Sequence, residues 1–458
     1  MTRLVDAGVD AGALMPLAEF HAWWAGLATA GRFSVERIPF SALDAWQFDK
    51  QTGNLGHASG RFFTVEGLRV REGGADTWSQ PIINQPEIGI LGIVVKQFNG
   101  VLHCLMQAKM EPGNANTLQL SPTVQATRSN YTQVHRGDRT RYLEHFVGPG
   151  RGQVVVDVLQ SEQGAWFWRK RNRNIVVLVT GEVPVHEGYC WLTLAQIRAL
   201  MRIDNLVNMD ARTVLSCMSF DLPDEGDTTG DDEFRDALVR SYQYGAGGAG
   251  ATRTAGDILS WFTEAKTRCD WTARLIPLGD VADWKRTDEE IADRDGRHFR
   301  IIAVDVTAGT REVRRWSQPL LHPRGEGRAE LAVRPIDGVL HVLVQARAEY
   351  GLMDMVEMAP TMHELPGAQP ADGETFGAGL LAAPGARTRF DTLLSEEGGR
   401  FYHALTRYRI VEVGAGAPLE VPPNYRWMTV RQIMDLLRHG HYLNIEARSL
   451  LACLHSLC

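Results

Sequence analysis

The chain has 458 residues, of which 44% are hydrophobic and 22% are charged, and its formal net charge is −7. This length exceeds a single hydrophobic core, so two or three domains are expected. The acidic balance, without a long basic run, argues against nucleic acid as the main partner.

Two features indicate the compartment. The first twenty residues lack the basic segment and apolar stretch of a signal peptide, and no apolar run approaches the roughly 18 residues of a membrane helix. The six cysteines are scattered and form no CxxC pair, which is typical of buried thiols in a reducing environment. We therefore expect a cytoplasmic protein that does not bind membranes.

The sequence repeats itself along its length. WSQP starts at residue 78 and again at residue 316, a spacing of 238 residues, and GVLH recurs at the same spacing. Later matches keep their order while the spacing shifts by a few residues, as loop insertions and deletions would produce. Such an ordered series indicates a tandem duplication. We predict a first domain over 12–220, a linker over 221–252 and a second domain over 253–458.

Each copy is expected to contain a β-hairpin. Residues 87–111 are typical of two strands joined at Asn99-Gly100, a dipeptide that favours a two-residue turn. The second copy has Asp337-Gly338 at the matching place, with the same turn chemistry. The hairpin is therefore predicted twice.

Helices are expected near the end of each copy. Thr193 and Thr429 each precede a Gln by three residues, which is the pattern of a capping box. Asn208 and Asn444 are good N-caps for a further short helix. Pro335 predicts an edge or irregular strand before the second hairpin turn. The predicted architecture is two α+β domains, each a mixed sheet flanked by helices.

The strand after the hairpin turn carries the first candidates for chemistry. Side chains alternate faces along a strand, so one face is apolar and the other becomes polar toward the strand end. A solvent-facing strand would also be polar, but it would not need to match between the copies in residue type. The matching polar residues are His103, Gln107, Lys109 and Glu111 in the first copy and His341, Gln345, Arg347 and Glu349 in the second.

The copies differ most in the segment that follows this strand. The first copy has a dense run of hydrogen-bonding side chains over 114–135, and the second has lost most of them. A polar run is also typical of a surface loop. Its asymmetry favours a ligand site in the first copy, built chiefly by residues 57–135, and a vestigial or structural pocket in the second.

Three short motifs carry weaker signals. The stretch GAGGAG at 245–250 matches GxGxxG, but it lacks the preceding strand of a dinucleotide site and is assigned to the linker. The basic RKRNRN at 169–174 fits a solvated face better than a phosphate contact. The HGH at 439–441 lacks partners at metal-ligand spacing, so no metal site is expected.

Four segments resemble the NDP-hexose 2,3-dehydratases of antibiotic deoxysugar pathways. They are WSQPIINQPEIGILGIVV, QAKMEPGNANTLQLSPTVQATRSNY, SEQGAWFWRKRNRN and NIEARSLLACL, and the resemblance extends over nearly the whole chain. It implies two duplicated Nudix-like domains. The Nudix metal-binding motif is absent from both copies, and the nearest glutamate pair, Glu396-Glu397, lies in a turn, so diphosphate hydrolysis is not expected.

The resemblance implies loss of water across C2 and C3 of dTDP-4-keto-6-deoxy-D-glucose. The C4 ketone acidifies the C3 hydrogen, a base removes it, and the enolate expels the C2 hydroxyl, so no cofactor is needed. A separate NADPH-dependent 3-ketoreductase would act on the labile 3,4-diketo product. We also expect a homodimer.

This reaction assigns roles to residues of the first copy. Glu111 is expected to be the base, Lys109 to stabilise the enolate or act as base, and Tyr131 to protonate the leaving hydroxyl. His57 is a further candidate base, and Trp78 stacks on the nucleotide or is a core tryptophan. The expected substrate-binding residues are His57, Trp78, Gln80, Gln107, Asn114, Gln119, Ser121, Thr123, Gln125, Arg128, Ser129 and Asn130.

Two other functions stay open at this point. A nucleotide-sugar-binding protein, such as a regulatory partner of a glycosyltransferase, would share the pocket but need no base. A metal-dependent nucleotide-sugar hydrolase would require Mg²⁺ and release dTMP.

Overall fold

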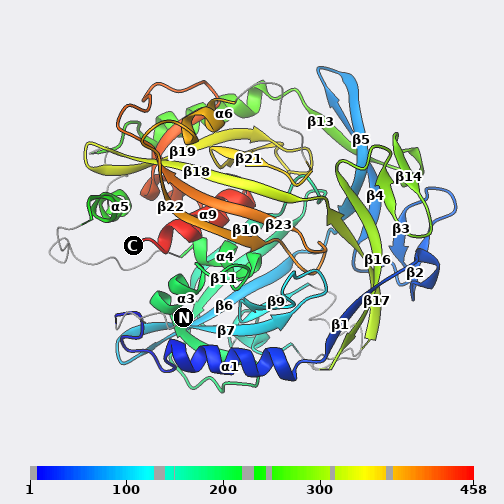
Figure 1. The fold of residues 1–458 in the computed structure, drawn as a ribbon, viewed down its shortest axis with the longest axis horizontal. Helices are drawn as coiled ribbons and strands as arrows, with labels where there is room; N and C mark the ends of the chain where they lie inside the picture. Colours follow the sequence, from blue (N-terminus) through cyan, green and yellow to red (C-terminus); the bar gives the residue numbers. More distant parts are fainter. Residues whose placement is uncertain are drawn as a thin grey trace.

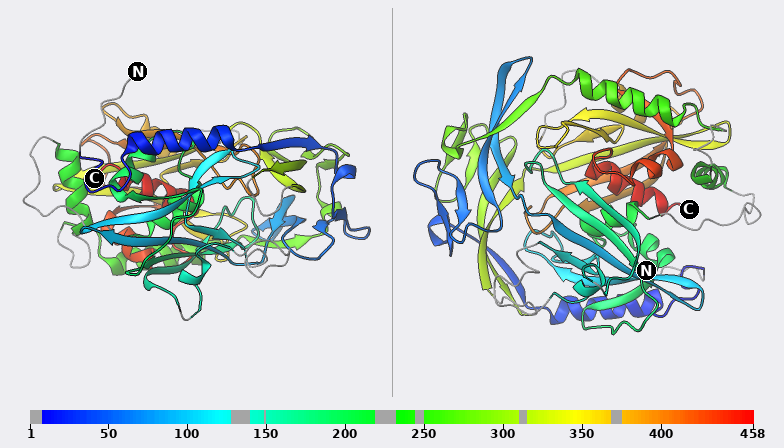
Figure 2. Two further views of the ribbon diagram at one scale, coloured as in Figure 1. Left: turned by 90° about the horizontal axis from the view of Figure 1, so that it is seen from below. Right: turned by 180° about the vertical axis from the view of Figure 1, so that it is seen from behind.

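The computed structural model describes residues 8–127, 140–148, 150–218, 232–243, 250–309, 315–367 and 375–458. Its helices are α1 (Leu17–Ala30), α3 (Leu194–Leu200), α4 (Met209–Ser216), α5 (Glu233–Gln243), α6 (Ala255–Arg268), α7 (Phe376–Leu381), α8 (Val430–Leu436) and α9 (Ile445–His455). Two large sheets lie above and below α4 and α9, and two small sheets lie at the right (Figure 1). Helices α1 and α6 lie on opposite outer sides (Figure 2).

The large sheet of the first half contains both parallel and antiparallel pairs. Its order is β10-β11-β6-β7-β12, with β8 also beside β7 and β9 beside β6, and β11 runs parallel to β6. Its strands are β6 (Gly89–Phe98), β7 (Val101–Met110), β8 (Leu118–Ser121), β9 (Val124–Ala126), β10 (Gln153–Ser161), β11 (Arg171–Leu178) and β12 (Tyr189–Thr193).

The large sheet of the second half repeats this pattern strand for strand. Its central strands are ordered β22-β23-β18-β19, with β20 and β24 beside β19 and β21 beside β18. The duplicated mixed-sheet architecture predicted from the sequence is confirmed. The strands are β18 (Glu326–Ile336), β19 (Val339–Ala348), β20 (Val356–Ala359), β21 (Met362–Glu364), β22 (Arg387–Ser395), β23 (Leu405–Glu412) and β24 (Tyr425–Thr429).

Both predicted hairpin turns are confirmed. Asn99 and Gly100 join β6 to β7 with φ of 50° and 82°, and Asp337 and Gly338 join β18 to β19 with φ of 49° and 76°. Two successive left-handed residues match the right-handed twist of the strands. The edge strand predicted from Pro335 is wrong, because β18 is central. Proline is tolerated there because pairing with β23 ends two residues earlier.

The two small sheets exchange a strand between the halves. Strand β1 of the first half pairs with β16 of the second, and β13 of the second half pairs with β4 of the first. The remaining strands of each small sheet come from one half. The strands are β1 (Phe33–Ile38), β2 (Trp46–Phe48), β3 (Leu55–His57), β4 (Thr64–Glu72), β5 (Ala75–Asn84), β13 (Thr272–Ile276), β14 (Trp284–Arg286), β15 (Ile291–Asp293), β16 (Phe299–Ala308) and β17 (Arg315–Pro323).

The duplicated WSQP segments hold the exchanged chain in place. They lie in β5 and β17. The amide of Asp44 donates to Ser317 Oγ at 2.7 Å, and the amide of Ala282 donates to Ser79 Oγ at 2.9 Å. Each bond joins one half to the other, so the repeated tetrapeptide has a structural function at this junction.

The predicted helix starts are confirmed. Thr193 and Thr429 form complete capping boxes, and Asn208 and Asn444 cap α4 and α9. The span predicted as a linker contains α5, which packs into the core of the second half and therefore belongs to it. The glycines at 245–248 lie outside the described residues. In the described part of the chain, no helix is long and apolar enough to cross a membrane.

Helices α4 and α9 meet at the centre of the molecule, each with a fully buried arginine. Arg212 donates to the carbonyl of Val207 in its own half at 2.8 Å and to that of Ser395 in the other half at 2.9 Å. Arg448, at the matching position of α9, donates to the carbonyl of Ser161 in the first half. The bonds are reciprocal, so both arginines join the halves through groups that water cannot reach.

Replacing Arg448 with Met should destabilise the whole chain, because the carbonyl of Ser161 would lose a buried charged donor. We expect the free energy of unfolding to fall by about 3 kcal/mol, measured by urea unfolding with circular dichroism. Arg438→Met is the control, since the Arg438 side chain is 69% exposed. It should change stability by less than about 0.5 kcal/mol. Equal effects of the two substitutions would contradict this role.

Candidate active site

A cluster of hydrogen-bonded polar side chains lies where β7 ends in the first half. Lys109 Nζ lies 3.5 Å from Glu111 Oε1 and donates to the carbonyl of Gln125 at 3.2 Å. Gln125 Nε2 donates to Glu111 Oε1 at 3.0 Å, and Asn208 Nδ2 donates to Gln125 Oε1 at 3.1 Å. Asn208 also caps α4. The helix start therefore fixes the amide that orients the glutamate.

Both faces of β7 are covered, so the solvent-facing alternative is wrong. Cys104 and Met106 pack under the helices, and Leu105 packs into a second core on the other face. The side chains of Lys109 and Glu111 are only 15% and 7% exposed. The polar end of the strand thus enters a largely enclosed site.

Further ionisable groups lie near this pair or beside Glu397, and no sequence pattern pointed to them. Burial, then the charges of Glu397, Glu162 and Glu111, raise the pKa of Asp210 well above its usual range. Burial also raises the pKa of Glu162 to about 8 and lowers that of Lys170 to about 8. Carboxyl groups that hold protons near neutral pH can act as acids.

The basic motif at 169–174 supplies one of these groups. Lys170 donates to the carbonyl of Glu87, and Asn172 Nδ2 donates to Glu162 Oε1 at 2.7 Å. Arg173 instead pairs with Asp157 at 2.6 Å on the outer side. The motif was predicted as a solvated face. Alternation along β11 was the signal that could have separated inward from outward residues.

A loop of the second half completes this site. The amide of Gly113 donates to the carbonyl of Gly398 at 2.7 Å, and a Cβ on Gly398 would lie 1.9 Å from Asn114 Oδ1. The neighbouring Glu397 is half-buried. The cluster at the end of β7 therefore has neighbours outside the predicted extent of 57–135, because crossing of the halves brings distant residues beside it.

Several predicted binding residues have structural contacts. Thr123 Oγ1 donates to the carbonyl of Leu105 at 2.5 Å and accepts from the amide of Val94 at 2.9 Å, which ties β7 to β6. Thr361 makes the matching bonds in the second half. Ser121, Asn114 and Gln119 are also buried. Ser121 Oγ donates to the carbonyl of Gln107 at 3.3 Å, and Asn114 Nδ2 donates to that of Thr117 at 3.0 Å. Gln119 Nε2 donates to Asn116 Oδ1 at 2.9 Å and to Ser395 Oγ.

Other predicted residues lie among the small sheets. Gln80 Nε2 donates to the carbonyl of Ala165 at 2.9 Å. The ring of Trp78 packs edge-on against that of Tyr350, with centroids 5.1 Å apart, as expected for a core tryptophan. His57 Nδ1 lies 2.7 Å from Ser59 Oγ. The predicted Arg128, Ser129, Asn130 and Tyr131 lie outside the described residues.

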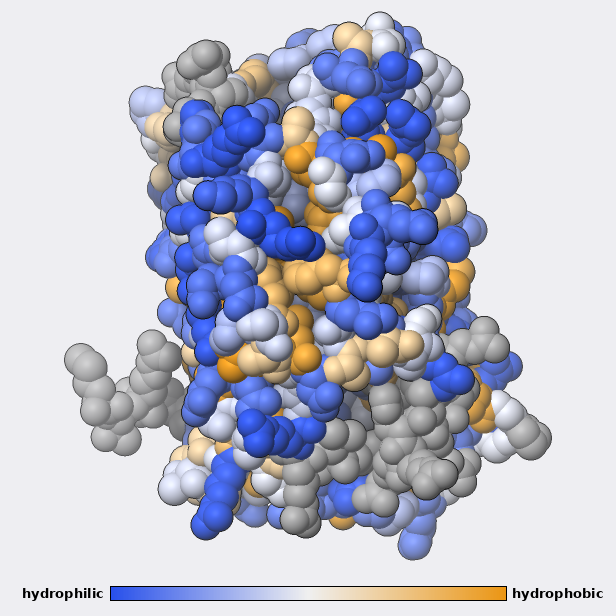
Figure 3. Space-filling view, turned by 90° about the vertical axis from the view of Figure 1, so that its right-hand side faces the viewer, coloured by the Kyte–Doolittle hydropathy of each residue, from blue (hydrophilic) through white to orange (hydrophobic). Residues whose placement is uncertain are grey.

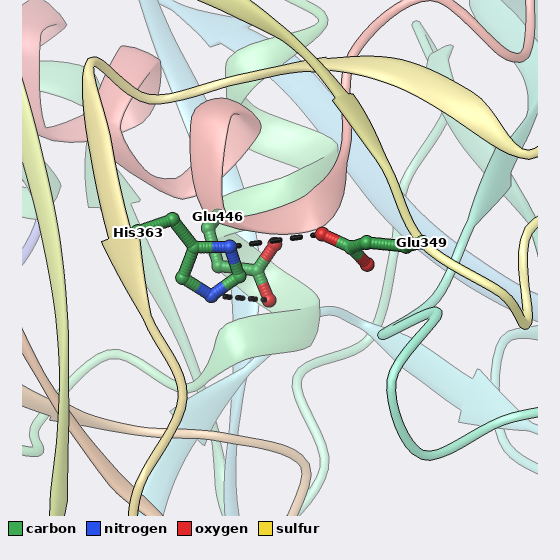
Figure 4. Close-up of side chains that lie close together, drawn as sticks. All are labelled: Glu349, His363 and Glu446. Atoms are coloured by element: carbon green, nitrogen blue, oxygen red, sulfur yellow. Dashed lines mark ion pairs between the residues drawn. The ribbon is translucent and has the colours of Figure 1, made fainter. Parts of the chain in front are cut away.

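The second half has a matching but different cluster, drawn in Figure 4. His363 stands where the first half has Gln125; its Nδ1 lies 3.6 Å from Glu349 and its Nε2 lies 3.8 Å from Glu446. Burial works to raise the pKa of Glu349, but the hydrogen bond and charge of His363 and the charge of Arg347 lower it. Burial raises the pKa of Glu446 well above its usual range.

These three side chains could by residue type hold a metal ion, since their ligand atoms lie within 4.8 Å of one another. However, the two nitrogens of His363 face different carboxylates. Arg347 Nε lies only 3.7 Å from Glu349 Oε1, so a cation already stands beside this carboxylate. Arg347, Glu349, His363 and Glu446 thus form a row in which basic and acidic side chains alternate, and this arrangement fits ion pairing better than a metal centre.

Two surface cavities of the described part of the chain can be compared with the clusters. One of about 410 Å³ is lined by Phe40, Trp46 and Phe48 on the small sheets. The side of the molecule seen in Figure 3 carries an apolar band between hydrophilic ridges. Another cavity of about 550 Å³ is lined by residues 375–384 and 413–418 and has no ionisable side chain. Neither cavity contains a residue of the two clusters.

Comparison with known proteins identifies the family. The family model described as NDP-hexose 2,3-dehydratase matches residues 17–218 and 255–454. The chain belongs to this family. The resemblance inferred from the sequence is thus confirmed, and the family model matches each half once.

Three relatives support this assignment over nearly their full length. Each is named dTDP-4-dehydro-6-deoxy-alpha-D-glucopyranose 2,3-dehydratase. The protein of Saccharopolyspora spinosa is 52% identical over 99% of this chain and 95% of its own. Those of Streptomyces violaceoruber and Amycolatopsis orientalis are 49% and 46% identical, over 96% and 99% of this chain and 97% and 93% of their own.

The raised pKa of Glu162 predicts a pH-dependent stability. Between the usual value of 4.5 and about 8, the folded protein binds a proton here that the unfolded chain has lost. Stability from this group is therefore lost as pH rises through that window. Relative to wild type, Glu162→Gln should gain on the order of 2 kcal/mol of unfolding free energy between about pH 5.5 and about pH 7.5.

Urea unfolding at the two pH values measures this change. Burial lowers the pKa of Lys170 and the charge of Glu162 raises it, so in the variant Lys170 loses its proton more easily, and this titration acts in the same direction as the expected gain. The exposed Glu187→Gln serves as control and should show no relative gain. A parallel pH dependence in Glu162→Gln and wild type would contradict the prediction.

Proposed function

We propose that this protein is a dTDP-4-keto-6-deoxy-D-glucose 2,3-dehydratase that yields a 3,4-diketo-2,6-dideoxy sugar. The observation that carries the proposal is the Lys109–Glu111–Gln125 cluster in the first half of a chain of this family. A carboxylate, a cation and buried acidic groups in one enclosed place are the parts that a β-elimination next to a ketone requires.

The mechanism follows from these parts. Glu111 removes the C3 hydrogen, which the C4 ketone makes acidic, and Lys109 stabilises the enolate oxygen. Re-formation of the ketone expels the C2 hydroxyl, which takes a proton from an acid, with Tyr131 as the candidate from the sequence. The resulting enol rearranges to the diketone. No net oxidation or reduction occurs, so no redox cofactor is needed.

The wider setting is part of the proposal. The scaffold is Nudix-like without the Nudix metal motif, with domains at 12–220 and 253–458, and the protein acts as a cytoplasmic homodimer in deoxysugar biosynthesis for an antibiotic. An NADPH-dependent 3-ketoreductase consumes the labile product. Gln80, Gln107 and Asn114 bind the nucleotide sugar, together with the other substrate-binding residues expected from the sequence.

The second pocket is proposed to be vestigial or structural. Its cluster has Arg347 in place of Lys109 and His363 in place of Gln125. Glu349 is held by Asn444 at 3.1 Å and faced by His363 and Arg347. Glu349 therefore stands in different surroundings from Glu111, which has Lys109 and the Gln125 amide beside it, and this difference supports the proposal.

A coupled assay tests the function. The protein is incubated with dTDP-4-keto-6-deoxy-D-glucose, a 3-ketoreductase and NADPH, and a 2,6-dideoxy sugar nucleotide is expected. Binding of the substrate without any such product would instead support the nucleotide-sugar-binding protein.

Substitutions should separate the two clusters. Lys109→Ala and Glu111→Gln should each reduce turnover by about 10²-fold or more, the scale of a lost acid–base or oxyanion group. Arg347→Ala and Glu349→Gln should stay within a few-fold of wild type. Equal losses from both pairs, at unchanged melting temperature, would show that the second cluster takes part in catalysis.

Metal removal distinguishes the dehydratase from a hydrolase. Because Lys109 supplies the positive charge at the enolate, turnover should survive EDTA, with no dTMP formed when Mg²⁺ is added. Product and dTMP are quantified in the same reaction by liquid chromatography. Loss of activity with EDTA and its recovery with Mg²⁺ would rule out this form of the mechanism.

A further inference from the structure

We propose that Glu397, which belongs to the second half, is the acid that protonates the departing C2 hydroxyl in the first-half site. The inference rests on the dehydratase function proposed above. It makes the active site composite, with the base from one half of the duplication and the acid from the other.

The position of Glu397 beside Glu111 carries the proposal. A Cβ placed on Gly399 would lie 3.1 Å from Glu397 Oε1 and 3.5 Å from Glu111 Oε1, so the two carboxyl groups flank one small space. The matching residue in the first half is Ala165, whereas Gly399 leaves this space open. The bond from Gly113 to Gly398 holds the loop there.

The asymmetry between the halves supports a role in chemistry. At the position of Glu397 the first half has Gln163, whose Nε2 donates to Glu396 Oε2 at 2.8 Å in the second cluster. At the position of Lys170 the second half has Ala404. An amide cannot transfer a proton as a carboxyl can. Only the cluster with Lys109 and Glu111 therefore contains a second carboxyl at this place.

The surroundings of Glu397 favour its protonated form. Burial raises its pKa, and the charge of Glu111 adds to this, against the opposing charges of Arg400, Lys170 and Lys109. Two neighbouring carboxyl groups of unequal proton affinity can divide the work of base and acid. Glu111 accepts a hydrogen bond from Gln125 and stands beside Lys109, so the proposal assigns it the role of base.

The proton transfers of the elimination are shared between Glu111 and Glu397. Glu111 takes the C3 proton, and the electron pair of that bond forms the enolate. As the C4 ketone re-forms, the C2–O bond breaks, and its pair leaves with the oxygen, which takes the proton of Glu397 and departs as water. In the later rearrangement C2 takes the proton from Glu111, and the C3 hydroxyl returns one to Glu397. Both residues are restored.

Glu397→Gln with two substrates tests the assignment. With the natural substrate, turnover should fall by about 10²-fold or more, while exchange of the C3 hydrogen in D₂O stays within a few-fold of wild type. With the 2-deoxy-2-fluoro analogue, fluoride leaves without an acid, so its release should also stay within a few-fold. Glu111→Gln should lose exchange and fluoride release together.

Controls keep the outcomes separate. Glutamine already occupies the matching position as Gln163, so the melting temperature of Glu397→Gln should not change, and Glu349→Gln removes a carboxyl from the second cluster as a matched control. Unchanged turnover of Glu397→Gln, or an equally large loss of fluoride release, would overturn the proposal. So would finding the acid pattern in Tyr131→Phe instead. No product from wild type would instead reject the dehydratase function itself.

Discussion

Exchange of a strand between the two halves is the constraint on which the rest of the structure depends. Because β1 completes the sheet of β16 and β13 completes that of β4, neither small sheet can form from one half alone. The crossing also positions the loops around Gly398 and Gly164 against the opposite half, where they donate or accept backbone bonds. Each cluster thus contains or adjoins residues of both halves, and its geometry depends on the small sheets that join the halves.

The first cluster brings ionisable groups together in a buried region, where a charged side chain is costly in free energy. Burial of unpaired charges costs several kcal/mol, so such groups either pair or change protonation. Here Lys109 stands beside Glu111, and burial raises the pKa of Glu162 to about 8 and that of Asp210 well above its usual range. This arrangement is poor for stability but suited to proton transfer, since a carboxylate beside a lysine and carboxyl groups of raised pKa lie in one enclosed space.

Local signals predicted local structure well. The hairpin turn at Asn99-Gly100 and the caps at Thr193 and Asn208 depend on residues within a few positions of each other, and all were confirmed. Lys109 and Glu111 became candidates because polar types repeat on one strand face, and the structure places them 3.5 Å apart. The edge position predicted from Pro335 was wrong because the residues around this proline do not show where the pairing between β18 and β23 ends.

The residues that were missed depend on distant contacts. Glu397 reaches Lys109 and Glu111 only through the crossing of the halves, which no pattern within either copy reports. Lys170 was hidden in a motif whose charges suggest a surface, although alternate residues point inward. Asp210 follows the N-cap of α4, and a buried carboxylate at a helix start reads as an ordinary stabilising residue of the first turn.

Duplication followed by interlocking explains which positions match and which differ. Arg212 and Arg448 carry reciprocal bonds across the centre, and Thr123 and Thr361 tie the same pair of strands in each half, so a change at these positions would disrupt packing in both. The positions that differ include Lys109 and Arg347, Gln125 and His363, and Glu397 and Gln163, all of which belong to the clusters or their adjoining loops. A second half whose cluster performs no chemistry would still be indispensable, because it supplies the exchanged strand and the loop that closes the first site.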